Sequence, residues 1–357
     1  MSSSVSGIPL PVLPAGSRGR TPVVTYTLSE QEAVRARELA QDCLTVYGSA
    51  GTAEFQRDVP VIAAGLPAGL RAAVNAARLD DRLHALVIRG NPLDEDALEG
   101  TPTHWRDADT PGSRVHAVLL ALYAALLGDA IGWATQQDGK VITDVLPIPG
   151  FEDSLVSSCS EQELGWHTED AFSTSRADYV GLYCLRSPER IPTTLAGVDL
   201  EAIPVRVADV LAQPRFLMLP DASHDPANNT GAGEGNPAAF ERLAQQQKEQ
   251  QRVAVLDGGP QAPVLRVDRD FTIAQDDDPD AADALRWIIG HLDSRLYDLV
   301  LEPGDVGFID NRNVVHGRRS FRPRYDGRDR WLKRVNIVGD LRRTRKDRAD
   351  GATRVIG

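Results

Sequence analysis

One stretch of the sequence reads Gly165-Trp166-His167-Thr168-Glu169-Asp170-Ala171-Phe172 and sets an imidazole and a carboxylate two residues apart. In an extended chain, residues i and i+2 point to the same face, so His167 and Glu169 can bind one ion together. A third ligand is available far downstream at His316. Two histidines and one carboxylate form the facial triad of non-haem Fe(II) oxygenases, which leaves coordination positions open for other molecules. The sequence therefore predicts a metal site made by these three residues.

The residues that follow His316 strengthen this interpretation, because a His-x-Glu pattern alone occurs often by chance. Arg330 and Arg334 lie on either side of Trp331-Leu332-Lys333. Plain burial or exposure of both histidines without a metal is one alternative. Zinc is another, since two histidines and a glutamate also serve zinc hydrolases. The sequence has no HExxH helix, and its ligands are far apart along the chain, which favours iron.

Taken together, these residues resemble the Fe(II)/2-oxoglutarate oxygenases of the clavaminate synthase-like branch, whose carboxylate ligand is a glutamate. The resemblance implies Fe(II) as the cofactor, with 2-oxoglutarate and O2 as co-substrates. It assigns Arg330 to the far carboxylate of 2-oxoglutarate, for which a permanently charged guanidinium fork is a suitable partner. It also implies that 2-oxoglutarate is decarboxylated to succinate while an unactivated C–H bond is oxidised.

The similarity extends to the arginine β-hydroxylases of this branch, of which the enzyme of the viomycin pathway is a member. It is carried by the ranges 128–138, 155–178, 265–271 and 304–340. It implies hydroxylation of free L-arginine at C3, at C4 or at both, in the biosynthesis of a non-ribosomal peptide or a related natural product. Desaturation of arginine, oxidation of a related basic amino acid, and a non-catalytic relative that only binds an amino acid are the alternatives.

By the same match, Asp268 and Asp270 hold the guanidinium of the substrate. The residues themselves agree with this, because two carboxylates at i and i+2 on a strand face repel each other unless a cation lies between them. A guanidinium is planar and offers five donors, which suits two carboxylates. An exposed Asp-Arg-Asp turn that pairs with Arg269 is the alternative.

The resemblance also assigns partners to the other charged groups of the amino acid. Arg334 takes the α-carboxylate, while Gln136 and the second oxygen of Glu169 take the α-amino group. Ser157 lies where its hydroxyl helps to position either small molecule. The sequence does not decide whether Gln136 or its neighbour Gln137 faces inward.

Composition limits the class of protein and its partners. With 357 residues, 42% of them hydrophobic and 25% charged, the chain is typical of a globular protein. Its net charge of −12 argues against a nucleic-acid partner, which normally requires a basic face. Three widely spaced cysteines favour the reducing cytoplasm over a disulfide framework. No apolar run reaches the roughly 18 residues of a membrane span. Nothing in the sequence indicates the oligomeric state.

The pattern of apolar and turn residues predicts a single oxygenase domain over 21–357 that follows a disordered lead over 1–20. Helices are expected at 27–47, 66–79, 113–129, 200–212, 238–252 and 281–296. Short strands are expected at 85–90, 141–146, 179–185, 264–267, 306–309 and 335–337. These elements predict an α+β fold with a double-stranded β-helix, or jelly-roll, core and helical insertions. A turn-rich stretch predicts a lid over 221–251, and the basic run 342–348 is expected to be a solvated terminal segment.

Overall fold

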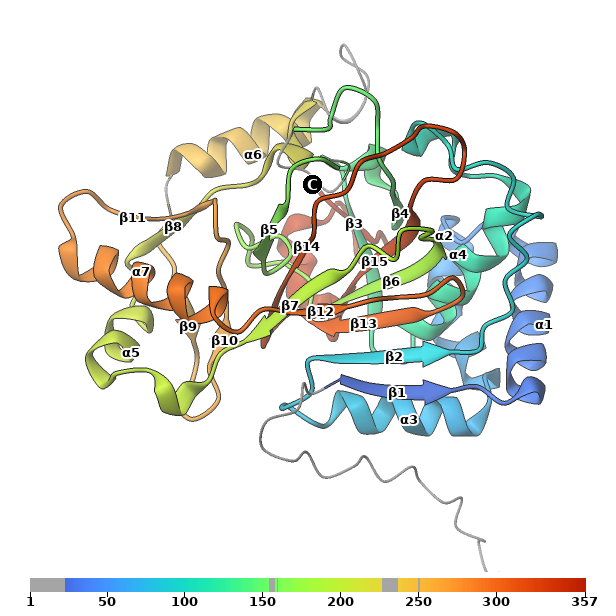
Figure 1. Cartoon of the computed structure of the whole chain (residues 1–357), viewed down its shortest axis with the longest axis horizontal. Helices are drawn as coiled ribbons and strands as arrows, with labels where there is room; N and C mark the ends of the chain where they lie inside the picture. Colours follow the sequence, from blue (N-terminus) through green and yellow to red (C-terminus); the bar gives the residue numbers. More distant parts are fainter. Residues whose placement is uncertain (1–22, 154–157, 159, 227–236, 250) are drawn as a thin grey trace, which may run out of the picture.

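The computed structural model describes residues 23–153, 158, 160–226, 237–249 and 251–357 (Figure 1). The predicted lead over 1–20, the site residue Ser157 and a central part of the predicted lid lie outside these residues. The described chain has a mixed α+β fold, in which a large sheet is covered by helices on one side and by a smaller sheet on the other.

The large sheet has eight strands in the order β1-β2-β13-β6-β15-β3-β16, with β4 beside β15. Its neighbours are antiparallel except at the two ends, where β1 runs parallel to β2 and β16 runs parallel to β3. The strands are β1 (Val23–Thr27), β2 (Ala85–Arg89), β3 (Asp129–Trp133), β4 (Ile142–Val145), β6 (Tyr179–Arg186), β13 (Val306–Asp310), β15 (Trp331–Val338) and β16 (Val355–Ile356).

The side chains of each strand alternate between the two faces of the sheet. Apolar side chains therefore lie on both faces, and helices cover one of them. On β6, Tyr183 and Leu185 join the core under the helices, whereas Leu182 and Cys184 face the smaller sheet. The helices that share this core are α1 (Glu30–Tyr47), α2 (Ala53–Ile62), α3 (Ala68–Arg78) and α4 (Pro111–Ala124).

The smaller sheet positions the metal-site residues. Its four strands run in the order β12-β7-β14-β5, and β14 pairs antiparallel with both β7 and β5. They are β5 (Leu164–His167), β7 (Thr193–Gly197), β12 (Tyr297–Leu299) and β14 (Val314–Arg318). Leu195 and Val314 of this sheet pack with Leu182 and Leu332 of the large sheet, so the cavity between β5, β14 and β15 has a rigid apolar floor.

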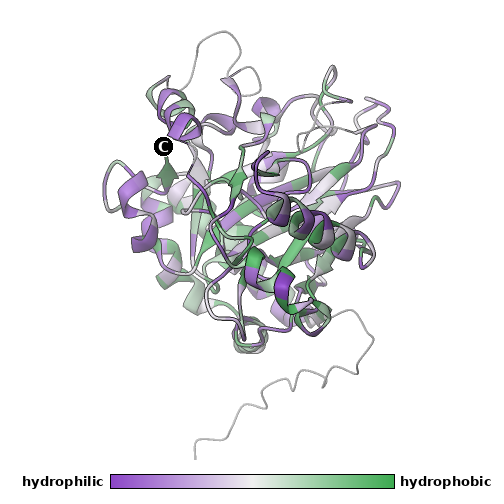
Figure 2. Cartoon of the chain, turned by 90° about the vertical axis from the view of Figure 1, so that its left-hand side faces the viewer, coloured by the Kyte–Doolittle hydropathy of each residue, from purple (hydrophilic) through white to green (hydrophobic). Residues whose placement is uncertain are grey.

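A third group of elements has its own core, in which α5 and α7 pack on short strands. It contains α5 (Val205–Leu211), α6 (Pro237–Glu249), α7 (Pro279–Asp293), β8 (Phe216–Met218), β9 (Leu256–Asp257), β10 (Val264–Leu265) and β11 (Thr272–Ala274). Figure 2 looks at the molecule from this side, and hydrophobic residues concentrate on the inner strands while the outer loops are largely hydrophilic.

Most of the helices predicted from the sequence are confirmed, with small shifts at their ends. The first begins at the N-cap Ser29, whose capping box with Glu32 is formed, and it ends at the left-handed Gly48. The helix predicted at 200–212 is wrong in part, because Pro204 separates a short 3-10 turn from α5. Among the elements that the sequence did not predict are β1, α2 and three strands of the smaller sheet, β7, β12 and β14.

The basic run near the C-terminus is not a solvated tail. Residues Leu341–Asp347 form a 3-10 helix whose Thr344 is buried. Arg343 pairs with Asp178, and the largely buried Arg348 donates to the carbonyls of Leu341 and Thr353. The guanidinium groups are therefore used to fasten the end of the chain.

Among the described helices, none is by itself long and apolar enough to cross a membrane, whereas one bent pair, Ala53–Gly65 with Ala68–Arg78, meets the criteria of length and composition across a bend of 110°.

The contact between β14 and β5 generates a prediction at Gly317, where the register of the two strands is irregular. A Cβ atom there would lie 2.6 Å from the carbonyl oxygen of Leu164 and 3.1 Å from Cα of Trp166. We expect Gly317→Ala to force the strands apart and to lower the free energy of unfolding by about 1–3 kcal/mol, measured by urea denaturation.

Gly290 is the matched control, because it lies inside α7 and a Cβ there meets nothing within 4 Å. Gly290→Ala should raise the free energy of unfolding by up to about 1 kcal/mol, since alanine favours the helix. Equal stability of the two variants would contradict the proposed crowding at Gly317.

Candidate metal centre

The three predicted metal ligands come together at the end of the smaller sheet. His167 ends β5, and His316 is its direct partner on β14. Oε2 of Glu169 lies 3.3 Å from Nε2 of His316 and 3.6 Å from Nε2 of His167. One ligand atom from each residue lies within 4.8 Å of the other two. This donor set and spacing fit a single ion bound by two imidazoles and one carboxylate.

Glu169 is held by its backbone rather than by the strand. The strand ends at His167, and Asp170 adopts a left-handed conformation with φ of 52°. Asn311 then binds both polar groups of the Glu169 backbone: its Oδ1 accepts from the amide N–H at 2.6 Å, and its Nδ2 donates to the carbonyl at 3.2 Å. The turn after β5 is therefore fixed by a residue from the distant stretch before β14.

The orientation of His167 suits metal binding through Nε2. Its Nδ1 lies 2.9 Å from the carbonyl oxygen of Gly165. A carbonyl can only accept, so Nδ1 carries the proton and the lone pair of Nε2 points to the metal position.

Charges around Glu169 keep it ionised although it is buried. Burial opposes ionisation, but Arg334 and the two histidines hold the pKa of Glu169 well below its usual value. Burial lowers the pKa of His316, which favours the neutral imidazole that a metal requires. Burial also disfavours the charged form of His167, but the hydrogen bond to Glu169, the charges of Asp268 and Glu169 and the hydrogen bond to Gly165 together outweigh it and raise the pKa to about 9. A metal ion requires the neutral form of this imidazole.

Arg330 lines the same cavity and has no acidic partner among the described residues. Its side chain is buried, with 5% of the residue exposed, and its Nε has no hydrogen-bond partner. Burial lowers the pKa of Arg330 to about 10. A buried guanidinium without an acidic partner is costly, so an anion bound in the cavity would stabilise Arg330.

Arg334, on β15, is bound differently from Arg330. Its Nη1 lies 2.8 Å from Oε1 of Glu169, and its Nη2 donates to Oε1 of Gln136 at 2.6 Å. The amide of Gln137 points away and binds the backbone of Asp144 instead. Of the two glutamines, Gln136 is therefore the one that contacts residues of the cavity wall, namely Arg334 and Ser223.

Asp268 and Asp270 lie in a turn, so their expected placement on a strand face is wrong. Oδ1 of Asp268 accepts from the backbone amides of Asp270 and Phe271, which bends the chain back. Asp268 nevertheless forms a bridge with His167, and the carboxylate of Asp270 lies against Cα of Gly165. Both carboxylates thus flank β5.

The alternative of an exposed Asp-Arg-Asp turn is borne out in part, because Arg269 and Asp270 are exposed turn residues that form an ion pair. Their closest approach is 3.7 Å, whereas Arg269 makes two contacts of 3.2 Å with Asp293. Burial raises the pKa of Asp268, which means that this carboxylate gains from a nearby cation.

Asp221 and Ser223 are among the residues of the cavity wall that sequence reasoning missed. Asp221 caps a short 3-10 turn, Ala222–His224, and accepts from the amide of Ser223. The hydroxyl of Ser223 accepts from Nε2 of Gln136 at 2.9 Å. The sequence signal was a turn after β8, which predicted a lid but not which of its side chains face inward.

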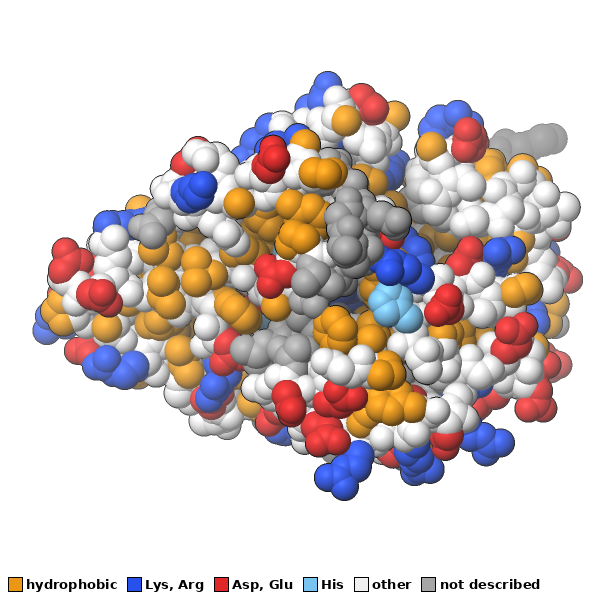
Figure 3. Space-filling view, turned by 90° about the horizontal axis from the view of Figure 1, so that it is seen from above, with side chains coloured by type: hydrophobic (Ala, Val, Ile, Leu, Met, Phe, Trp, Pro, Cys, Tyr) orange, Lys and Arg blue, Asp and Glu red, His pale blue; other side chains and the backbone are white. Residues whose placement is uncertain are grey.

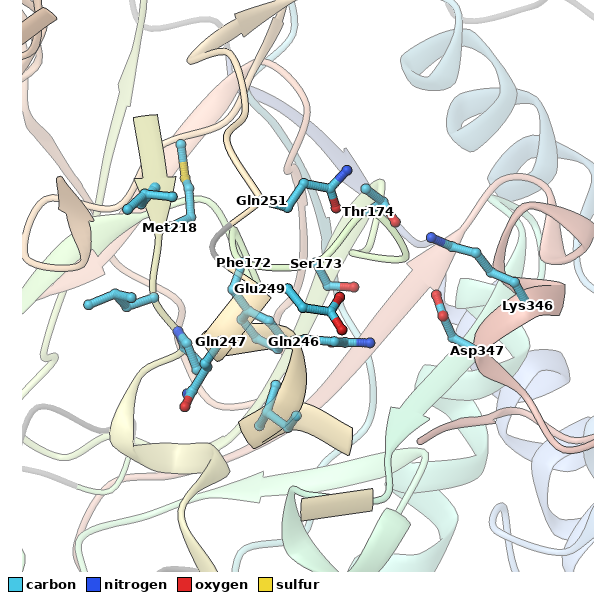
Figure 4. A pocket seen from close by; sticks show the side chains of 14 residues that line it. Phe172, Ser173, Thr174, Met218, Gln246, Gln247, Glu249, Gln251, Lys346 and Asp347 are labelled. Carbon is cyan, nitrogen blue, oxygen red and sulfur yellow. The ribbon is translucent and has the colours of Figure 1, made fainter. Parts of the chain in front are cut away.

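Another cavity, shown in Figure 4, lies between α6 and the loop that follows Glu169. Phe172, Gln246 and Lys346 are among its lining residues, and none of the predicted site residues takes part. It is larger than the cavity at the metal centre, about 930 against about 560 Å³ with their open mouths included. The metal-centre cavity remains the candidate site because it alone combines the ligand triad with Arg330.

The chain matches the family model of the taurine catabolism dioxygenase TauD, TfdA family over residues 66–336. It is 38% identical to the enduracididine beta-hydroxylase of Streptomyces hygroscopicus, with 94% of this chain and 100% of the relative covered. It is 39% identical to the L-ornithine/L-arginine 3-hydroxylase of Catenulispora acidiphila, with 92% and 98% covered.

A solved structure is similar over the same length. The non-heme iron oxygenase OrfP, in complex with Fe, succinate and (3S)-hydroxy-L-Arg, superposes with a TM-score of 0.89 at 42% identity, covering 93% of this chain and 99% of OrfP. Other OrfP structures hold Fe with alpha-ketoglutaric acid, or Fe and succinate with (3R,4R)-dihydroxy-L-Arg. The resemblance inferred from the sequence is confirmed by these matches.

The geometry predicts that His316→Ala loses the metal but keeps the fold, because it removes one of three protein ligands. Calorimetric titration of the metal-free protein with Fe(II), in the absence of O2, measures the binding, and circular dichroism reports the fold. His291→Ala is the control, since His291 lies on α7 outside the cavity. Metal binding of equal strength in His316→Ala and wild type would exclude His316 as a ligand.

Proposed function

Because the chain belongs to the TauD/TfdA family of dioxygenases, we propose that it hydroxylates free L-arginine at C3, at C4 or at both, using Fe(II), 2-oxoglutarate and O2. One observation carries the proposal, namely the distribution of charge around the metal centre. Arg330, which has no acidic partner among the described residues, lines the cavity together with Asp221, while Asp268 and Asp270 lie beside β5, whose His167 also lines it. Such a cavity suits one dianionic and one cationic ligand at the same time.

The residues fit iron and 2-oxoglutarate. His167, Glu169 and His316 would hold the metal, and their donor set is that of the non-haem Fe(II) oxygenases. When bound, iron with 2-oxoglutarate and O2 supplies the oxidant: one oxygen atom enters succinate, CO2 leaves, and the other oxygen atom enters the C–H bond of the substrate. Arg330 binds the far carboxylate of 2-oxoglutarate through its guanidinium fork.

The remaining residues place the amino acid. Arg334 takes the α-carboxylate, and Gln136 with Oε1 of Glu169 takes the α-amino group. These groups already contact one another, with Arg334 bound to both acceptors. An incoming α-ammonium group can replace the guanidinium at Glu169 and Gln136, and the freed guanidinium then follows the α-carboxylate. One cation replaces another, so Glu169 is never left without a positive neighbour.

The side chain of arginine then extends toward Asp268 and Asp270. Two carboxylates near β5 hold the guanidinium with charge-assisted hydrogen bonds, and this contact fixes how C3 and C4 lie relative to the metal. Rigid placement decides which hydrogen is removed, because a shift of about 1 Å can change reactivity by orders of magnitude. The hydroxylases of amino acids to which the chain is similar support this substrate class.

The wider context follows from the same proposal. The two facing sheets form a double-stranded β-helix, residues 21–357 are one oxygenase domain, and the enzyme works in the cytoplasm in the biosynthesis of a peptide natural product. The buried free thiols of Cys43 and Cys184 support a reducing compartment. On the face seen in Figure 3, acidic and basic side chains are interspersed, as suits a partner that is a small molecule. The predicted lid over 221–251 and the role of Ser157 stay predictions.

Product mass tests the function directly. Purified protein is incubated with L-arginine, 2-oxoglutarate, Fe(II) and O2, and the amino acid is analysed by mass spectrometry. A gain of one or two oxygen atoms supports hydroxylation once or twice, and NMR assigns the carbon. Loss of two hydrogen atoms would show desaturation instead, oxidation only of other basic amino acids would show a different substrate, and binding of arginine without turnover would show a non-catalytic relative.

Arg330→Ala should raise the concentration of 2-oxoglutarate that gives half-maximal rate, because loss of a buried charged partner costs roughly 3–5 kcal/mol. Succinate formation is measured at increasing 2-oxoglutarate. Arg328→Ala is the control, since Arg328 is exposed and lies two residues earlier in the chain. A half-saturation point that stays at the wild-type value in Arg330→Ala would exclude this role.

Asp268 and Asp270 should select for charge at the end of the substrate side chain. Citrulline has nearly the shape of arginine but is neutral, and it would leave two carboxylates without a cation. Changing both residues to asparagine should reduce the ratio of kcat/KM for arginine over citrulline. The exposed pair Asp276 and Asp277, changed in the same way, is the control. If the ratio is the same in all three proteins, these aspartates do not bind the guanidinium.

A further inference from the structure

His224 is a buried histidine outside the metal triad, with 3% of its surface exposed. Both of its ring nitrogens are engaged. Nδ1 lies 2.7 Å from Oγ1 of Thr135, and Nε2 lies 3.3 Å from Oδ1 of Asp170. The imidazole therefore connects three segments that are distant in the sequence: the one after β3, the one after β5 and the one after β8.

The surroundings of the imidazole leave it little freedom. Its ring meets Phe172 and Trp133 edge to face, with centroid distances of 4.8 and 5.5 Å. The other oxygen of Asp170 accepts from Nε1 of Trp133 at 2.7 Å and from Nδ2 of Asn336 at 3.0 Å. Both ring nitrogens of His224 and both carboxylate oxygens of Asp170 are bonded in this buried network, which rigidifies what it connects.

The three residues joined through the imidazole are sequence neighbours of residues at the candidate site: Thr135 of Gln136, Asp170 of Glu169, and His224 of Ser223. The turn Ala222–His224 has only three residues and packs by its buried histidine. The packing of the buried His224 side chain thus holds the side chains of Asp221 and Ser223 at the cavity wall.

We infer that His224 is a positioning residue for the proposed oxidation of arginine, which holds Asp221 and Ser223 where they meet the amino acid. The inference rests on the proposed function. Binding of the amino acid should then depend on His224, whereas binding of 2-oxoglutarate should not, because Arg330 makes no described contact with His224 or its two partners. If His224 had only a structural role, its loss would weaken the binding of the amino acid and of 2-oxoglutarate alike.

The test compares two histidines of equal burial. His116 is also 3% exposed, and its Nδ1 lies 2.9 Å from the hydroxyl of Tyr183 in the core under the helices. His224→Ala and His116→Ala both remove a buried, hydrogen-bonded imidazole, so both should lower Tm. Only His224→Ala should weaken arginine binding, on the order of tenfold, while half-saturation by 2-oxoglutarate changes by less than about twofold.

Three readouts are measured on the iron-loaded protein. Calorimetry without O2, in the presence of 2-oxoglutarate, gives the Kd of arginine independently of turnover. Steady-state kinetics gives KM for each substrate. The amount of succinate formed per hydroxylated arginine should rise in His224→Ala, because 2-oxoglutarate is then decarboxylated in turnovers in which a misplaced arginine is not hydroxylated. Thr135→Val removes only the hydrogen-bond partner of Nδ1, so it should change the Kd of arginine, its KM and the succinate ratio in the same direction but by less. This variant replaces His224→Ala in the test if His224→Ala does not fold.

A double-mutant cycle tests whether His224 affects arginine binding through Ser223. If His224 acts through Ser223, then Ser223→Ala should have little further effect on arginine binding in the His224→Ala background. His224→Gln should restore part of the affinity, because its amide nitrogen can reach toward Asp170.

An equal rise in KM for arginine and 2-oxoglutarate would overturn the inference, and so would an unchanged Kd for arginine or strict additivity with Ser223→Ala. These outcomes leave the proposed function standing, since wild type still binds and oxidises arginine. A wild-type protein that does not bind arginine would instead overturn the proposed function, and this inference with it.

Discussion

The pairing of β14 with β5 is the constraint on which the site depends. It sets His316 directly opposite His167 although the two residues are far apart in the sequence. Backbone hydrogen bonds of a sheet fix neighbouring residues to within a few tenths of an ångström, which side chains on loops cannot match. Glu169 lies just beyond the strand, and the side chain of Asn311 replaces the missing ladder by binding both polar groups of its backbone.

Buried charge is the second feature that organises the molecule. The chain buries several arginines together with a lysine, although each costs free energy to desolvate. Lys333 is compensated by Asp144 on the helix side of β15, and Arg176 by the carbonyls of Asn311 and Leu265. Arg330 has no such partner among the described residues. A site that is destabilising in the free protein is one in which binding of the correct anion restores stability.

The two faces of β15 carry side chains with different roles. Arg334 and Leu332 face the cavity, while Trp331 and Lys333 face the helices and meet at the carboxylate of Asp144. Because side chains alternate along a strand, the cavity can change its ligands without disturbing the core behind it. A change in the network around His224 would affect the cavity, because this network connects the cavity wall to the turn that carries the metal ligand Glu169.

By itself the sequence determined which residue types are present and in what order. The His-x-Glu pattern and the downstream histidine predicted the triad that the structure brings together, and the two arginines predicted an anion site, because these functions need particular functional groups. Capping signals located α1 for the same reason, since Ser29 and Glu32 act within one turn. Tertiary structure alone decided that Gln136 rather than Gln137 contacts Arg334 and Ser223, that Asp268 and Asp270 lie in a turn, and that Asp221 and Ser223 line the cavity. Such choices depend on packing between distant segments, which no local pattern of residues specifies.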